Sequence, residues 1–259
     1  MIKRRVVVVG AAGQIAESLL PALRERYDLV LLDIRDQDTS GTPIEGIVVS
    51  DLLNRGRDTY RGHFRDADAV IHCGFVRSEG PGLEFWAEHA NIQMAYNIYQ
   101  TCVEEGVRRV VVTSSNHAAD HYEPLILDGK CDFVSPATQA RSDNYYGWAK
   151  DAYEHLGFVF ATGHVAGRPL ENVQIRIGGP RDTDVAACKL GDMRCVRRAL
   201  AVDISQRDTV QLYVKSIETE DIQDEHGVLL LMPSTYLQRR LRRVVGESQA
   251  NYAVSHGVS

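Results

Sequence analysis

The sequence predicts a doubly wound α/β fold with a parallel sheet, because strand-like runs alternate with helical segments along most of its 259 residues. Val6 to Val9 form an uninterrupted β-branched run, which is typical of a parallel strand covered on both faces. Further strands are expected at 28–32, 47–49, 69–71, 110–113 and 173–177. Such alternation implies right-handed crossovers and one large domain.

Helical spacing of apolar residues predicts the helices between these strands. The first helix is expected at 14–26, and a longer one at 83–105 ends at Gly106, a favourable C-terminal cap. Another helix is expected at 144–162. Residues 116–143 lose the periodicity, so they are expected to form a long loop, and such loops are usually functional.

The composition excludes several classes of function. A hydrophobic content of 44% and a charged content of 25% indicate an ordinary soluble globular protein. The net charge of −6 provides no positive field for nucleic acid or anionic lipid. The apolar run near the N-terminus is too short for a signal peptide or a membrane span. We therefore expect neither nucleic acid nor a membrane as a partner.

The five cysteines are at positions 73, 102, 131, 188 and 195. They lack CxxC spacing and do not pair with nearby histidines in a metal-ligand pattern. They are interpreted as reduced structural thiols of a cytoplasmic protein, and no metal site is expected.

A glycine-containing turn joins the first predicted strand to the first helix. It reads Gly10-Ala11-Ala12-Gly13-Gln14-Ile15-Ala16. Small residues let the backbone approach a pyrophosphate, and the helix N-terminus supplies free N–H groups and a positive dipole. This context predicts a dinucleotide site, although such turns also occur for purely steric reasons.

Polar residues at the ends of the next strands fit the same cofactor. Asp33, twenty residues after Gly13, can accept hydrogen bonds from both ribose hydroxyls and so favours NAD over NADP. Arg35 leaves room for NADP, and Asp33 could instead open a surface turn. Asp51 and Leu52 follow the third strand, and His72 follows the fourth. They are expected either to line the cofactor site or to have a structural role alone.

These features predict a Rossmann-type doubly wound parallel sheet with a small C-terminal substrate lobe. The NAD-binding domain is expected over residues 1–180, and it includes the helix at 144–162. The lobe is expected over 181–259. Its predicted elements are a helix at 207–218, a strand at 228–232 and a basic helix at 238–245.

Tyr146 and Lys150 are four residues apart and therefore share one helix face. A phenol is a poor base at neutral pH, but a neighbouring ammonium group stabilises the phenolate and lowers the pKa of the phenol. The neighbouring Tyr145 has Ala149 as its i+4 partner, which selects Tyr146 as the candidate base. Tyr/Lys pairs at this spacing also arise by chance on exposed helices.

A polar string, Thr113-Ser114-Ser115-Asn116-His117, ends the fifth predicted strand. Open α/β sheets bind ligands at this carboxyl edge. Ser115 could hydrogen-bond a reacting oxygen, whereas the alternative is simple capping of the strand end by hydroxyls.

In their order and separation, the glycine turn, Asp33, the strand-end serine and the Tyr146/Lys150 pair resemble the extended short-chain dehydrogenase/reductase family over roughly residues 1–230. The resemblance implies that Ser115, Tyr146 and Lys150 are catalytic. It further implies that Asn91 orders a proton-relay water.

Within that family the sequence is most similar to uronate dehydrogenases. The supporting strings are the glycine turn 10–14, Ser114-Ser115-Asn116-His117, Tyr146-Gly147 and Arg176-Ile177-Gly178. This similarity implies that Ser115, Asn116 and His117 contact a sugar, and that Arg176 binds its carboxylate. A guanidinium fork suits a carboxylate, although Arg176 could equally form an ordinary salt bridge. Arg77 and the tail beyond Met232 depart from the pattern.

The expected function is NAD-dependent transfer of a hydride from a hydroxyl-bearing carbon of a small sugar or sugar acid. One alternative is an epimerase or dehydratase that retains NAD and uses the same catalytic residues. Another is a nucleotide-sensing protein without chemistry, because fold alone does not establish function. The oligomeric state stays open, with a homo-oligomer among the options.

Overall fold

The computed structural model describes residues 3–131, 133–136, 138–179, 188–193, 195–196, 204–220, 222 and 228–231. Their strands form one sheet in the order β3-β2-β1-β4-β5-β6-β7. The bounds are β1 Arg5–Val9, β2 Asp28–Asp33, β3 Ile47–Val49, β4 Ala69–His72, β5 Arg109–Ser115, β6 Glu171–Ile177 and β7 Val228–Leu231.

The predicted parallel sheet is confirmed by the strand pairing. β1 pairs in parallel with both β2 and β4, so that Val9 stands opposite Leu32 on one side and His72 on the other. β2 pairs with β3 and β4 pairs with β5, again in parallel. Four of the five residues of β1 and all of β4 are buried, as a parallel sheet covered on both faces requires.

The described helices include the four long ones that the sequence predicted. They are α1 Gln14–Arg26, α2 Glu84–Glu104, α4 Tyr145–Ala161 and α6 Gln206–Glu218, with the short α3 at Tyr122–Leu127. α2 ends as predicted, because Gly106 has a φ of 75° and the N–H of Val107 donates to the carbonyl of Cys102 at 2.9 Å.

The prediction of an unstructured loop over 116–143 is wrong in part. The segment contains a 3-10 helix at Asn116–Ala119 and the six-residue α3. Both are too short to produce a visible apolar periodicity. Pro124 does not prevent α3, because it occupies the first helical turn, where proline is tolerated.

The chain forms two compact units. Unit 1 comprises Met1–Thr113, Ala152–Gln174 and Val210–Leu229, and unit 2 comprises Ser114–Asp151, Ile175–Thr209 and Leu230–Ser259. The predicted domain boundary at residue 180 lies outside the described residues, as does the predicted basic helix at 238–245. The lobe over 181–259 stays a prediction, and most of the helix expected in it at 207–218 belongs to unit 1 as part of α6.

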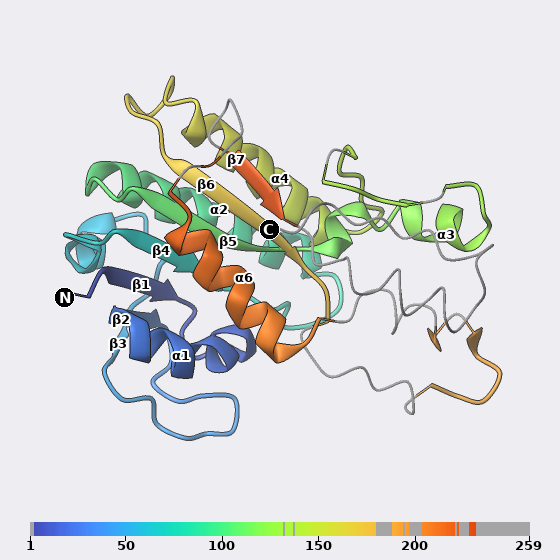
Figure 1. The fold of residues 1–259 in the computed structure, drawn as a ribbon, viewed down its shortest axis with the longest axis horizontal. Helices are drawn as coiled ribbons and strands as arrows, with labels where there is room; N and C mark the ends of the chain where they lie inside the picture. The colour runs from blue at the N-terminus through green and yellow to red at the C-terminus, as the bar shows by residue number, and fades with distance from the viewer. Residues whose placement is uncertain are drawn as a thin grey trace. The chain divides into compact units, whose positions relative to one another are not determined.

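Within unit 1, helices cover both faces of the sheet. α2 packs beside the second half of α4, where the hydroxyl of Tyr99 donates to the carbonyl of Tyr153 at 3.1 Å. The end of α6 contacts the end of α1, because the hydroxyl of Tyr27 donates to Glu218 at 3.0 Å. Figure 1 shows α6 in front of the strands and α2 behind them.

Two adjacent arginines at the start of β5 hold the C-terminal end of α6. The fully buried Arg109 donates to the carbonyls of Ser216 and Thr219, at 2.9 and 2.7 Å, and pairs with Glu171. Cations at a helix C-terminus satisfy carbonyls that lack helical partners and favour the dipole.

The neighbouring Arg108 extends this cluster to the edge of β4. It pairs with both carboxylate oxygens of Asp68 at 2.9 Å. The hydrogen bond from Arg108 holds the pKa of the Asp68 carboxyl below its usual range. The start of β5 is therefore tied to its neighbours by one buried arginine and a partly exposed ion pair.

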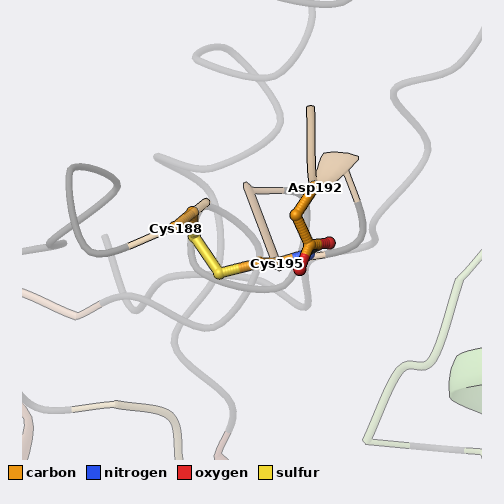
Figure 2. The surroundings of a disulfide bond; sticks show 3 residues. All are labelled: Cys188, Asp192 and Cys195. Carbon is orange, nitrogen blue, oxygen red and sulfur yellow. Dashed lines mark hydrogen bonds between the residues drawn. A yellow bond between two sulfur atoms is a disulfide. The ribbon is translucent and has the colours of Figure 1, made fainter. Parts of the chain in front are cut away.

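The expectation of reduced cysteines is wrong for two of the five. Cys188 and Cys195 form a disulfide, with a Cα–Cα distance of 5.7 Å (Figure 2). A turn brings them together: Gly191 adopts a φ of 86°, and Asp192 accepts a hydrogen bond from the N–H of Cys195 at 2.9 Å. Sequence spacing alone did not reveal this turn. The cytoplasmic location loses the support of these two thiols and stays a prediction.

No helix among the described residues is both long and apolar enough to cross a membrane.

Replacement of Arg109 by methionine is expected to lower the free energy of unfolding by at least about 2 kcal/mol, because it leaves buried carbonyls of α6 without donors. The matched control is Arg5→Met, which removes an exposed pair with Asp28 at 3.0 Å. That change is expected to cost less than about 1 kcal/mol. Urea denaturation of both variants makes the comparison, and similar losses would show that Arg109 does not anchor α6.

Candidate active site

The glycine turn in unit 1 requires glycine at its first position. Gly10 has a φ of 77°, which side chains rarely adopt. A Cβ atom at this position would also overlap the backbone of Cys73 and Gly74, which follow β4. The turn is therefore pressed directly against the end of the neighbouring strand.

α1 begins immediately after this turn and leaves its first N–H groups available. Its N-cap is Gly13, which offers no side-chain hydrogen bond. The N–H groups of Gln14 and Ile15 lie in the first helical turn, where no intrahelical carbonyl can reach them. Free N–H groups and a positive helix end suit the oxygens of a pyrophosphate. The residues of the turn therefore fit a dinucleotide.

Asp33 is joined to the turn in the structure. One carboxylate oxygen accepts a hydrogen bond from the N–H of Ala12 at 3.0 Å, and the other accepts from the N–H of Arg35 at 3.1 Å. The guanidinium of Arg35 in turn donates to the carbonyl of Ala12 at 2.8 Å. Asp33 thus shapes the turn. Its contact with ribose stays a prediction.

The remaining cofactor candidates of unit 1 have structural contacts of their own. Asp51 accepts a hydrogen bond from the N–H of Leu53 at 2.9 Å, and the carbonyl of Leu52 accepts from Asn97 at 2.8 Å. His72 is buried, and its Nδ1 accepts from the N–H of Gly74 at 3.2 Å. These contacts neither require nor exclude a bound cofactor.

Asn91 on α2 binds the backbone of one residue with both ends of its amide. Its Oδ1 accepts from the N–H of Val76 at 2.7 Å, and its Nδ2 donates to the Val76 carbonyl at 3.0 Å. The same Nδ2 lies 3.1 Å from the Glu88 carboxylate. Asn91 therefore fixes the segment after β4, a role that the sequence did not indicate. Its role in a proton relay stays a prediction.

Unit 2 brings together the Tyr/Lys pair and the histidine after β5. Nζ of the buried Lys150 lies 5.3 Å from the centroid of the Tyr146 ring. The His117 ring is 5.4 Å from the same ring, in an edge-to-face arrangement with an interplanar angle of 68°. Two nitrogen-bearing side chains thus contact the candidate base.

The strand-end serine lies next to this histidine. Ser115 is buried, and its Oγ accepts a hydrogen bond from the N–H of His117 at 3.2 Å. Asn116 follows it in the 3-10 helix at Asn116–Ala119. Arg176 lies in β6 and is 2% exposed. The roles of these residues toward a substrate stay predictions.

Sequence reasoning missed two residues of unit 2 that contact this group. Asp120 accepts from Nδ1 of His117, at 2.9 and 2.7 Å to its two oxygens. Asn144 caps α4 through the N–H of Gly147 at 2.9 Å and donates its own Nδ2 to Asp120 at 2.8 Å. The signals were present, since Asp120 follows His117 by one helical turn and asparagine favours N-cap positions.

The sheet order and the glycine turn before a helix N-terminus define a Rossmann-type α/β protein, and this turn fits a dinucleotide. The chain belongs to the NAD dependent epimerase/dehydratase family, which it matches over residues 6–166. This confirms the family resemblance seen in the sequence.

Two curated relatives have a similar degree of identity. The L-arabinose 1-dehydrogenase (NAD(P)(+)) of Haloferax volcanii is 27% identical over 221 residues, which cover 83% of this chain and 82% of that protein. The uronate dehydrogenase of Pseudomonas syringae pv. tomato is also 27% identical over 221 residues, covering 84% of this chain and 71% of that protein.

Solved structures share the fold. A mutated uronate dehydrogenase aligns with a TM-score of 0.68 and 24% identity, covering 96% of this chain and 77% of the other. A glucuronic acid dehydrogenase from Chromohalobacter salexigens aligns with a TM-score of 0.67, also at 24% identity, covering 96% of this chain and 80% of the other. These likenesses confirm the predicted fold class.

Gly10→Ala is expected to destabilise the protein more than Gly41→Ala does. Both glycines have a positive φ, but only at Gly10 would the new Cβ meet backbone atoms, whereas Gly41 faces open space. Strain at such a φ costs about 1–2 kcal/mol in both variants. The overlap at Gly10 adds about 1–3 kcal/mol. Equal unfolding free energies in urea would contradict the close approach of the turn to the end of β4.

Proposed function

We propose that this protein is an NAD-dependent dehydrogenase that oxidises a hydroxyl-bearing carbon of a small sugar or sugar acid. The observation that carries the proposal is the position of the Lys150 ammonium, 5.3 Å from the Tyr146 ring centroid. A positive charge at this distance stabilises phenolate, which is the form of tyrosine that accepts a proton. A protein that only senses nucleotides has no use for this pair.

In the proposed reaction Tyr146 accepts the proton of the substrate hydroxyl. The oxygen becomes a carbonyl oxygen as hydride leaves the same carbon, and oxidation at an anomeric carbon gives a lactone. Ser115 positions the reacting oxygen, and Lys150 keeps Tyr146 able to accept the proton. Asn116, His117 and Arg176 hold the rest of the substrate.

Bound NAD supplies the hydride acceptor. The N–H groups at the start of α1, beginning with Gln14 and Ile15, would hold the pyrophosphate. Asp33 would accept the ribose hydroxyls, with Asp51, Leu52 and His72 along the remaining path. NAD is favoured over NADP because a carboxylate repels a 2′-phosphate, but Arg35 beside it offers a charge that could bind one.

The relatives support the choice of substrate class. Two of them are named for oxidation of a sugar acid and of a neutral sugar, at 27% identity each. Identity at this level supports the chemistry more than the particular sugar. The alternative, an epimerase or dehydratase that retains NAD, regenerates its cofactor in each cycle and therefore accumulates no NADH.

Tyr146→Phe is expected to reduce turnover by at least about 100-fold, because the proton acceptor is removed. Binding of NAD, measured by calorimetry, is expected to stay within about twofold. The matched control is Tyr145→Phe, which removes the same hydroxyl from the adjacent, exposed tyrosine. Turnover that survives in Tyr146→Phe, or is lost equally in Tyr145→Phe, would refute the assignment of the base.

NADH formation with a panel of free uronic acids and neutral aldoses tests the substrate class. We expect uronic acids to be oxidised, and Arg176→Lys to raise their KM by about tenfold or more while leaving the KM of neutral aldoses unchanged. Circular dichroism controls for folding, since Arg176 is buried. No NADH from any sugar would favour the retained-NAD alternative or a protein without chemistry.

A further inference from the structure

The imidazole of His117 is held by a carboxylate. Its Nδ1 lies 2.9 and 2.7 Å from the two oxygens of Asp120, whose side chain is only 16% exposed. An ionised carboxylate can only accept hydrogen bonds, so the hydrogen in this contact belongs to Nδ1. In the neutral ring, Nε2 is then left as a hydrogen-bond acceptor.

Asp120 also fixes the helix that carries the candidate base. One of its oxygens accepts from Nδ2 of Asn144 at 2.8 Å. Asn144 is the N-cap of α4, because its Oδ1 accepts from the N–H of Gly147 at 2.9 Å. A single carboxylate therefore binds both the histidine after β5 and the first turn of the Tyr146 helix.

The backbone of this turn approaches His117 so closely that only glycine fits. A Cβ atom at Gly147 would overlap the carbonyl oxygen of His117 and the side chain of Ser142. The edge-to-face contact between the His117 and Tyr146 rings, at 5.4 Å, lies directly beside this point. Three contacts thus fix His117: the Tyr146 ring, the Asp120 carboxylate and the close approach of Gly147 to its backbone.

We propose that Asp120 is a positioning residue that holds His117 as the Nδ1–H tautomer and offers Nε2 to a hydroxyl group of the sugar beside Tyr146. The inference rests on the proposed function and specifies which part of the substrate lies at this end of the site. In this neutral tautomer Nε2 accepts a hydrogen bond from a hydroxyl, but it has no hydrogen to donate to a carboxylate. The negative charge of Asp120 opposes a second carboxylate nearby. We therefore expect the carboxylate of a sugar acid to lie away from His117.

Asp120→Asn tests the tautomer without removing the link to α4. The new amide oxygen can still accept from Asn144, while the new amide nitrogen donates to Nδ1 of His117 and moves the ring proton to Nε2. Nitrogen-15 NMR of the histidine rings, with the His117 signal assigned through a His117→Gln variant, is expected to show Nδ1–H in the wild type and Nε2–H in Asp120→Asn. The same tautomer in both proteins would overturn the proposal.

Kinetics provide the second readout. Asp120→Asn is expected to raise the KM of the sugar on the order of tenfold, because Nε2–H no longer accepts the hydroxyl, with the Kd of NAD unchanged. Asp120→Glu, which keeps a carboxylate, is expected to restore part of the loss. An unchanged KM in Asp120→Asn would refute a role for this residue in substrate binding.

The matched control is Asp143→Asn. Asp143 also accepts a hydrogen bond from Asn144, at 3.1 Å, and it is exposed. Its replacement is expected to change neither the tautomer nor the KM, and an effect equal to that of Asp120→Asn would count against the proposal.

Absence of turnover in the wild type would refute the proposed function and the substrate role of His117, whereas the NMR signature tests the Asp120–His117 contact by itself.

Discussion

The architecture depends on one strand that pairs on both sides. β1 is bonded in parallel to β2 and to β4, so the sheet grows away from it in two directions. The strand order reverses at β1, and open α/β sheets bind ligands at the carboxyl ends of the strands beside such a point. Gly10 stands at this point. Pairing of β1 on both sides therefore fixes where this turn begins.

The candidate residues of unit 1 and those of unit 2 are stabilised by different means. The glycine turn is held by backbone contacts, because Gly10 lies too close to the backbone of Gly74 for a side chain to fit. Asp33 and Arg35 then lock the turn through hydrogen bonds to Ala12. In unit 2 the arrangement depends on side chains, with Asp120 binding both His117 and Asn144. Asp120 is the member that both of the others contact, so its replacement changes both contacts at once.

Most of the fold could be predicted from the sequence because its strands are buried runs with strong local signals. The predicted strand at 47–49 and the helix at 14–26 have the bounds found in the structure, and β5 extends the prediction to Arg109 and Ser115. Those extra residues are polar, so burial patterns alone could not include them. The sequence also indicated which polar residues follow the strands. Because the carboxyl ends of parallel strands lie at one edge of the sheet, these residues were expected at that edge.

What the sequence could not predict depends on contacts between distant or irregular segments. The pairing of His117 with Asp120 has a visible signal, their spacing of one helical turn, but it was missed because the loop prediction omitted the 3-10 helix. The Cys188–Cys195 disulfide depends on a turn with a positive φ at Gly191. Asn91 and Asp33 each hold nearby backbone in position. The sequence could not distinguish this structural role from a role at the cofactor, because spacing predicts where a residue lies but not its hydrogen-bond partners.

The anchoring of α6 by Arg109 has a consequence for how the chain is made. The guanidinium in β5 and the carbonyl of Ser216 that it binds are 107 residues apart in sequence. Ribosomes add about 5–20 residues per second, so on the order of five to twenty seconds separate the two during synthesis. Throughout that interval Arg109, the first residue of β5, lacks the carbonyls of Ser216 and Thr219 that it binds in the finished fold. We therefore expect the full anchoring of β5 to form only after α6 has been synthesised.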